Sequence, residues 1–242
     1  MLHLVIGLAT CALFFSWASP VRRERSIQRW SKQLLGICDV RVELKNAVAL
    51  SVLNHAMIVA NHVSWLDIFV INSLQPCRFV AKSSVRNWPL IGWLSAQAGT
   101  VYIARGNRAD LRRLYEDLIG SMHAGERIAF FPEGTTAGQG NLLPFHANLF
   151  EAAIEAKVPI QPYALRYLDA AGAYHAAVDF VGEMSFTASM IVILKSRKIT
   201  AELIMLPAID SAGAHRRDLA STARESVAQA LGLQEQDQEA TA

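Results

Sequence analysis

Two side chains that can share a proton lie close together in the first third of the sequence. An apolar segment at residues 57–60 is followed by Asn61-His62-Val63-Ser64-Trp65-Leu66-Asp67. The pattern predicts a buried strand, a turn that carries His62, and a helix that Ser64 caps. The positive end of this helix would keep the imidazole neutral, as a general base requires. Asp67 could bind the other ring nitrogen and stabilise the imidazolium that forms during reaction.

A purely structural interpretation of the same residues is also open. Ser64 and Asp67 have the spacing of a capping box, in which Asp67 would serve only the end of the helix. A lone histidine near a turn is more often structural than catalytic, and short motifs are weak evidence. The rest of the chain must decide between the two interpretations.

Length and composition narrow the class of protein. The chain has 242 residues, enough for one large domain or for one domain with an appendage. Hydrophobic residues make up 52% and the mean hydropathy is +0.23, which is apolar for a soluble domain and indicates membrane association. The net charge of only +2 argues against a nucleic-acid-binding protein.

Sequence motifs for metals, disulfides and common cofactors are missing. Cys11, Cys38 and Cys77 form no close pair, which argues against a disulfide framework or a zinc site and fits a reducing compartment. The H-E-x-x-H, G-x-S-x-G, Walker A and G-x-G-x-x-G patterns do not occur. We therefore expect no metal and no bound cofactor.

The N-terminal region combines an apolar segment with a basic one. Residues 2–18 are almost uncharged, and the cations that follow are Arg22, Arg23, Arg25, Arg29 and Lys32. Charge after the apolar segment is the reverse of a secretory signal, and the positive-inside rule then places the rest of the chain in the cytoplasm. We expect residues 1–38 to form a membrane anchor, either a transmembrane helix or a half-inserted hairpin. The alternative is a hydrophobic helix packed on the protein itself.

Within the basic part, apolar residues recur at helical spacing. They are Ile27, Trp30, Leu34 and Ile37. This pattern predicts a basic amphipathic helix that can lie on an anionic membrane surface.

Alternating strand and helix patterns follow. We expect strands at residues 40–44, 57–60, 78–81, 100–104, 127–131, 158–166, 176–181 and 200–206, and helices at 65–74, from near 107, at 147–156, 184–194 and 214–231. This order predicts an α/β fold with a mostly parallel or mixed sheet flanked by helices, in a domain spanning residues 39–232. The apolar residues 88–94 suit either the core or a membrane-facing loop. The polar tail, residues 233–242, is expected to be disordered.

Three predicted strand ends carry unusual polar residues. The first carries His62, the second carries Arg105 before a glycine, and the third carries Glu133, Gly134 and Thr135. Each is unremarkable alone. If the strands are neighbours, however, a base, a guanidinium and a carboxylate converge. Arginine binds phosphate in a bidentate fashion, and glycine permits close approach of the backbone.

Four motifs in order resemble those of the glycerolipid acyltransferase family, which includes the 1-acylglycerol-3-phosphate acyltransferases. The first is the His62-x-x-x-x-Asp67 motif, and the other three are Tyr102-Ile103-Ala104-Arg105, Phe131-Pro132-Glu133-Gly134-Thr135-Thr136 and Val158-Pro159-Ile160-Gln161-Pro162. The resemblance covers residues 40–206, and four motifs in sequence are specific where one is not.

The resemblance implies roles for these residues. His62 would deprotonate the acceptor hydroxyl and Asp67 would orient His62. Arg105, with Glu133 and Gly134, would hold the phosphoglycerol end of the acceptor, with Thr135 in the same loop. The hydroxyl would attack the thioester of acyl-CoA or acyl carrier protein directly, without an acyl-enzyme.

One departure from the family pattern affects the acceptor site. Many relatives have a Pro-Phe-Lys-x-Gly run after the third motif, whereas this chain has Pro144-Phe145-His146-Ala147-Asn148. His146 replaces a cation, so Lys82 and Arg105 become the better candidates for binding the phosphate.

The resemblance leaves several functions open. The leading one is a lysophosphatidate acyltransferase that makes phosphatidate at the cytoplasmic face of a bacterial plasma (inner) membrane, with membrane lipids, a lysophospholipid acceptor and acyl-CoA or acyl carrier protein as partners. An acyltransferase for lyso-ornithine lipid or another lysophospholipid shares all four motifs. A membrane-bound, non-catalytic lipid-binding protein is a different class, although such a protein could dispense with His62 or Asp67. A hydrolase would need a nucleophile or metal cluster, which the sequence does not offer.

Overall fold

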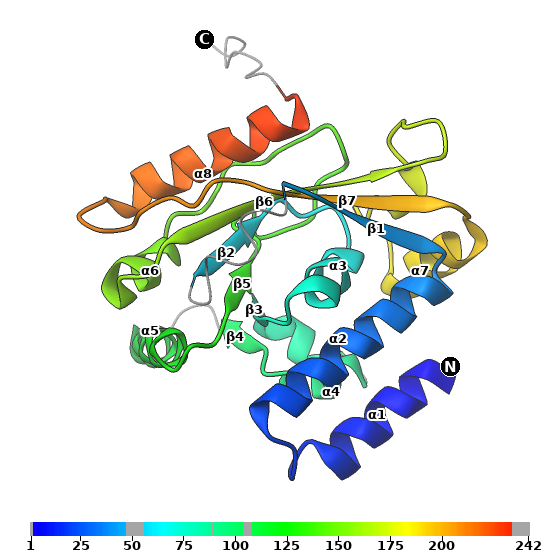
Figure 1. The fold of residues 1–242 in the computed structure, drawn as a ribbon, viewed down its shortest axis with the longest axis horizontal. Helices are drawn as coiled ribbons and strands as arrows, with labels where there is room; N and C mark the ends of the chain where they lie inside the picture. Colours follow the sequence, from blue (N-terminus) through cyan, green and yellow to red (C-terminus); the bar gives the residue numbers. More distant parts are fainter. Residues whose placement is uncertain (1, 47–55, 89, 104–107, 234–242) are drawn as a thin grey trace.

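A seven-stranded sheet organises the chain within the part that the computed structural model describes, residues 2–46, 56–88, 90–103 and 108–233 (Figure 1). The strands are β1 (Val40–Lys45), β2 (Met57–Ala60), β3 (Arg78–Lys82), β4 (Val101–Ile103), β5 (Ile128–Phe130), β6 (Ile160–Leu168) and β7 (Ile199–Met205). Their order is β1-β7-β6-β2-β5-β3-β4.

The sheet is mixed, as the sequence predicts. β2 is parallel to β5 and β6, and β3 is parallel to β4 and β5, whereas β7 runs antiparallel to β6. The carboxyl ends of β2, β5, β3 and β4 therefore lie along one edge of the sheet, where α/β proteins place their sites.

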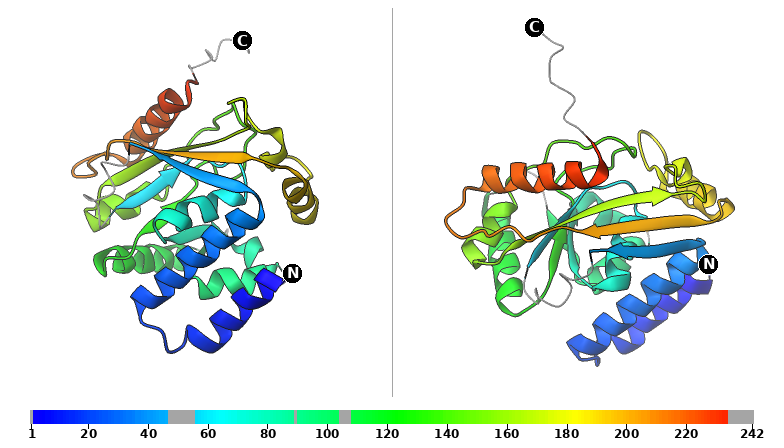
Figure 2. Two further views of the ribbon diagram at one scale, coloured as in Figure 1. Left: turned by 45° about the vertical axis from the view of Figure 1, so that its right-hand side comes forward. Right: turned by 45° about the horizontal axis from the view of Figure 1, so that its top comes forward.

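Helices cover both faces of this sheet (Figures 1 and 2). The helices are α1 (Leu2–Phe14), α2 (Pro20–Ile37), α3 (Leu66–Leu74), α4 (Ile91–Gln97), α5 (Arg108–His123), α6 (Phe150–Ala156), α7 (Phe186–Lys195) and α8 (Arg216–Leu231). α2 and α3 lie on one face, with α1 and α4 outside them, and α5, α6 and α8 lie on the other.

β2 shows why the central strands read as unbroken apolar runs. All four of its residues are buried. Ile58 and Ala60 belong to the core beneath α2 and α3, whereas Met57 and Val59 belong to the core beneath α5, α6 and α8. Successive side chains point to opposite faces, so a strand covered on both sides must be apolar throughout.

The strand predicted at residues 176–181 is wrong. Ala176–Val178 forms a short 3-10 helix, η3, with Val178 fully buried. The residues after it turn toward the loop between β2 and α3, where the Phe180 N–H donates to the Val63 carbonyl at 3.2 Å. The apolar residues of this segment therefore anchor a loop and do not pair as a strand of the sheet.

The N-terminal region forms two packed helices. No helix in the described ranges is long and apolar enough to cross a membrane, so the predicted transmembrane helix is not supported; α1 has 13 residues. On one side of α1, Gly7 packs against Trp30 of α2, and Cys11 and Phe15 are buried. On the other side, Leu13 and the nearby Trp17 are strongly exposed.

Part of the apolar stripe predicted for the basic helix packs inside the protein. α2 turns this stripe toward α1 and α3, where Trp30 contacts Phe69 and stacks on His3, and Leu34 packs against the core. Ile37, the last residue of the stripe, stays 54% exposed, so the protein itself covers only part of this pattern. The predicted disordered tail falls almost entirely on residues 234–242, outside the described residues.

Candidate active site

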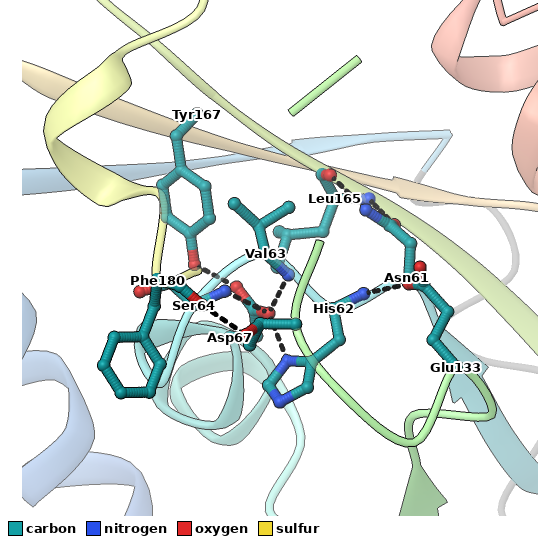
Figure 3. A network of polar contacts seen from close by, with 10 residues as sticks. Asn61, His62, Val63, Ser64, Asp67, Glu133, Leu165, Tyr167 and Phe180 are labelled. Carbon is teal, nitrogen blue, oxygen red and sulfur yellow. Dashed lines mark hydrogen bonds and ion pairs between the residues drawn. The ribbon is translucent and has the colours of Figure 1, made fainter. Parts of the chain in front are cut away.

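The predicted catalytic pair meets in the loop that leaves β2. His62 Nδ1 lies 2.7 Å from Asp67 Oδ2 (Figure 3). Asp67 is fully buried, and the His62 side chain keeps 19% of its surface exposed. Among the described residues no group hydrogen-bonds His62 Nε2, so this nitrogen can exchange a proton with a ligand. The pair thus has the geometry of a general base oriented by a carboxylate.

Asp67 makes the contacts that both interpretations of the sequence require. Besides His62, its Oδ2 accepts the backbone N–H groups of Val63 at 2.8 Å and Ser64 at 2.9 Å. Its Oδ1 accepts the hydroxyl of Tyr167 at 2.6 Å. The carboxylate therefore holds the loop and orients the imidazole at once.

Ser64 does not cap the helix with its side chain, contrary to the sequence prediction. α3 begins after Trp65 without a side-chain cap, and the buried Ser64 hydroxyl has no hydrogen-bond partner in the described part of the chain. Only half of the capping box is formed, the bond from the Ser64 N–H to Asp67. α3 begins at Leu66, one residue later than predicted, and Asp67 accepts the N–H groups of both Val63 and Ser64.

Glu133 fixes the backbone of the base from the neighbouring strand. Its Oε1 accepts the His62 N–H at 2.7 Å, and its Oε2 accepts the Leu143 N–H at 2.9 Å. Burial raises the pKa of this carboxyl above its usual value, and the two N–H groups oppose that effect. With both oxygens engaged, Glu133 supports the base and the 134–143 loop; a direct contact with substrate stays a prediction.

The segment around Glu133 makes two further contacts with His62. The His62 ring stacks on Phe131 with centroids 3.9 Å apart and planes 7° apart. The His62 carbonyl accepts the Ala137 N–H at 2.8 Å. Backbone N–H, carbonyl, ring face and Nδ1 are thus all held, which leaves the base little freedom except at Nε2.

Gly134 allows the loop after β5 to turn toward the base. Its φ is +69°, a region that glycine adopts without strain, and a Cβ there would approach the His146 ring at 3.3 Å. Thr135 is exposed beside it, whereas the Thr136 hydroxyl donates to the Phe180 carbonyl. Gly134 and Thr135 therefore lie at the surface, and their contact with substrate stays a prediction.

The predicted cations are placed unevenly. Lys82 is exposed at the carboxyl end of β3, the neighbour of β5 in the sheet. Arg105 falls on residues 104–107, outside the described ranges. The described residues contain no group of three or more histidine, cysteine, aspartate or glutamate side chains that could hold a metal ion.

Tyr167 is a site residue that the sequence patterns did not reveal. It is fully buried on β6, and burial, aided by the Asp67 carboxylate, raises the pKa of its hydroxyl well above its usual value. The hydroxyl therefore stays protonated and donates to Asp67. Its contact spans 100 residues along the chain. A tyrosine among the apolar residues of a buried strand was the available signal, since a buried hydroxyl needs a partner.

Asn61 is a second missed residue of the site. Its amide oxygen accepts the Leu165 N–H at 2.8 Å and its amide nitrogen donates to the Leu165 carbonyl at 2.9 Å. The side chain thereby continues the β2–β6 pairing past the end of β2. Tyr167 and Asp67 are brought together because the two strands stay locked up to this point.

A buried carboxylate paired with a histidine that keeps one open nitrogen, at the edge of a mixed α/β sheet, is the arrangement of a site that can take a proton from a ligand. Comparison with known proteins identifies the family. Residues 40–166 match the family described as Acyltransferase, and the chain belongs to it.

Relatives with two different acceptor names are similar to this chain. The lyso-ornithine lipid O-acyltransferase of Pseudomonas aeruginosa is 38% identical over 173 residues, which cover 72% of this chain and 66% of that protein. The 1-acyl-sn-glycerol-3-phosphate acyltransferase of Neisseria gonorrhoeae is 32% identical over 198 residues, covering 82% and 77%.

The fold also has a solved counterpart. The crystal structure of the 1-acyl-sn-glycerophosphate (LPA) acyltransferase PlsC from Thermotoga maritima superposes with a TM-score of 0.65 over 98% of this chain and 96% of that one. The sequence identity is 20%, so this likeness concerns the fold.

Proposed function

We propose that this chain transfers a fatty acyl group from a thioester, acyl-CoA or acyl carrier protein, to the free hydroxyl of a lysophospholipid, and that lysophosphatidate is the acceptor. The observation that carries the proposal is the 2.7 Å contact of His62 Nδ1 with Asp67 while Nε2 stays open. A non-catalytic lipid-binding protein would have no use for a histidine held on every side but one.

The reaction needs only proton transfer and positioning from the protein. His62 Nε2 takes the hydroxyl proton as the acceptor oxygen attacks the thioester carbonyl. Asp67 stabilises the imidazolium. The carbon–sulfur bond breaks, and the departing thiolate regains a proton from His62. No covalent acyl-enzyme is needed, and no cysteine adjoins the base in the sequence.

The central test is turnover of purified protein with a labelled acyl donor and a panel of lyso-lipids. His62→Ala should lose activity by about 10²–10⁴-fold while its thermal unfolding stays close to that of the wild type. Near-normal turnover of this variant would refute the mechanism. The same panel, run with acyl-CoA and acyl carrier protein, identifies the donor.

Arg105 is proposed to bind the acceptor phosphate together with Lys82. Lysine keeps the charge but loses the bidentate geometry, so Arg105→Lys should raise the KM for lysophosphatidate and leave the KM for the acyl donor nearly unchanged. Some loss of kcat is expected too, because binding energy far from the hydroxyl also orients it. Equal effects on both KM values would contradict a phosphate-binding role.

Lyso-ornithine lipid is the second candidate acceptor. It is favoured by the 38% identity to the Pseudomonas aeruginosa relative. Efficient acylation of lyso-ornithine lipid with poor acylation of lysophosphatidate would overturn our acceptor assignment and leave the proton-transfer mechanism intact.

We further propose that α1 holds the protein on the cytoplasmic face of a bacterial plasma membrane. The exposed side of this segment includes Leu13 and Trp17, with Trp17 89% exposed, and exposed cations such as Arg25 and Arg29 follow on α2. Leu13→Ser with Trp17→Ser should shift protein toward the soluble fraction. Substitution is preferable to deletion, because α2 packs on α3 through the core.

A further inference from the structure

The most exposed large apolar side chains gather on one side of the molecule. Among the described residues they lie on α1 and the ends of α2, around α4, and on α7 with the segment before it, with Tyr174 as the exception. α6 and α8, on the opposite face of the sheet, carry none of them. Figures 1 and 2 place α7 on the same side of the molecule as the N-terminal end of α1.

α7 has apolar residues on its outer face as well as on its inner one. Ser189 and Ile193 are fully buried against the protein. Ile191, Val192 and Leu194 point outward and are 45%, 40% and 42% exposed. A surface helix normally carries polar residues on its outer side, so this face requires an apolar environment to cover it.

Cations flank the outer face of α7 at its C-terminal end. Lys195, Arg197 and Lys198 are all exposed there. Two acidic residues lie nearby: Glu183, before the other end of the helix, and Asp39, whose carboxylate accepts the Lys198 N–H at 2.9 Å. An apolar face with a basic border matches the surface of an anionic bilayer, in which acyl chains lie beneath charged headgroups.

The α7 face is continuous with the other exposed apolar residues. The rings of Trp88 and Phe186 lie 5.8 Å apart, and α4, which follows Trp88, packs on α1. Trp88 and Trp93 are partly exposed, and tryptophan favours the boundary between lipid and water. One apolar band therefore runs from α1 through α4 to α7.

α7 also touches the loop of the catalytic base. The indole N–H of Trp65 donates to the Ser189 hydroxyl at 3.1 Å, and its ring meets Phe186 edge-on at 5.1 Å. Trp65 lies three residues after His62. Whatever covers the outer face of α7 is thus brought next to the site.

We propose that α7 is a second lipid-binding element, whose outer face inserts into an anionic phospholipid bilayer beside the catalytic loop. This proposal rests on the proposed function, because an enzyme that acts on lipids must work at a lipid surface. Its role would be to orient the site toward the bilayer that supplies the acceptor.

The first test measures binding of the full chain to sedimented vesicles in the absence of substrates. Ile191→Ser with Leu194→Ser should weaken partition to phosphatidylcholine–phosphatidylglycerol vesicles by about tenfold or more, whereas Tyr174→Ser, an exposed apolar residue outside the band, should not. Wild-type binding by the α7 variant would overturn the proposal. Because no substrate is present, this result is independent of whether acyl transfer is confirmed.

The basic border has its own matched test. Lys195→Gln with Arg197→Gln should lower partition to the anionic vesicles by about 30-fold and leave partition to pure phosphatidylcholine unchanged. Arg113→Gln with Arg217→Gln, on α5 and α8, removes the same charge from exposed positions on the other side. An equal loss in both pairs would indicate attraction by net charge alone and count against a specific role of α7.

A direct measurement of insertion uses a fluorescent label. The three native cysteines are buried, so Val192→Cys and Arg217→Cys can each be labelled with an environment-sensitive dye. We expect a blue shift on adding vesicles only at position 192. The absence of a shift at position 192 would overturn the proposal. The proposal would also fail if the wild type formed a dimer without lipid, the α7 variants lost this dimer, and their vesicle binding stayed intact. The outer face of α7 would then bind a second copy of the chain.

Discussion

Replacing Asp67 with asparagine would separate the two roles of this carboxylate. Oδ2 receives three N–H groups, from His62 and from the backbone of Val63 and Ser64. Oδ1 receives only the Tyr167 hydroxyl. An asparagine can put its oxygen in place of Oδ2 and direct its NH₂ toward Tyr167, whose hydroxyl can rotate to accept. We therefore expect Asp67→Asn to keep the loop geometry and the Nδ1–H hydrogen bond that orients His62.

Catalysis by this variant should nevertheless fall by about a thousandfold. Unit charges roughly 4 Å apart interact by about 4 kcal/mol at an effective dielectric constant of 20. A neutral amide cannot provide this stabilisation for the imidazolium, and about 4 kcal/mol corresponds to about 10³-fold in rate. The loss should appear in kcat, because the proton moves only during reaction.

The assay compares kcat, KM and thermal unfolding of Asp67→Asn with those of Asp67→Ala. Alanine leaves the N–H groups of Val63 and Ser64 and the Tyr167 hydroxyl without an acceptor, at about 1–3 kcal/mol for each buried group. Asp67→Ala should therefore unfold well below the wild type, and Asp67→Asn close to it. If Asp67→Asn turned over at nearly the wild-type rate, Asp67 would be only a helix-end residue and our mechanism would be refuted.

Two further substitutions test the support of the dyad. Glu133→Gln should destabilise the protein by about 1–3 kcal/mol, since both oxygens accept fixed backbone N–H groups and an amide can satisfy only one; an unchanged melting temperature would show that the loop adapts. Tyr167→Phe removes a donor to the buried Asp67 and should cost about 1.5–3 kcal/mol of stability with a smaller loss of kcat than Asp67→Asn. A fall in kcat as large as that of Asp67→Asn would make the tyrosine more than a support.

Local patterns in the sequence predicted most of the elements because the central strands are covered on both faces. A buried strand such as β2 must be apolar throughout, and polar residues appear where it ends at Asn61. The contact of His62 with Asp67 was predictable because the two residues lie within one loop and one helical turn of each other. The segment at residues 176–181 misled because its apolar residues anchor a loop.

Contacts between distant segments could not be predicted in this way. Tyr167 reaches Asp67 only because β6 lies beside β2, and strand order is not written in local periodicity. The stripe on α2 has the pattern of a membrane-surface helix, yet Trp30 and Leu34 of this stripe pack inside the protein. Amphipathicity reports that a face will be covered, not what will cover it.

The contacts of Glu133 connect the 134–143 loop to the backbone of His62. The His62 N–H donates to one oxygen of the Glu133 carboxylate, and the Leu143 N–H donates to the other. Gly134 and Thr135, which are predicted to contact the acceptor, lie between Glu133 and Leu143 in the sequence. A shift of this loop on binding a headgroup would pull on the backbone of His62 through two hydrogen bonds. The proposed acceptor site and the general base therefore form one mechanical unit, so a headgroup that seats the loop poorly should lower kcat as well as raise KM.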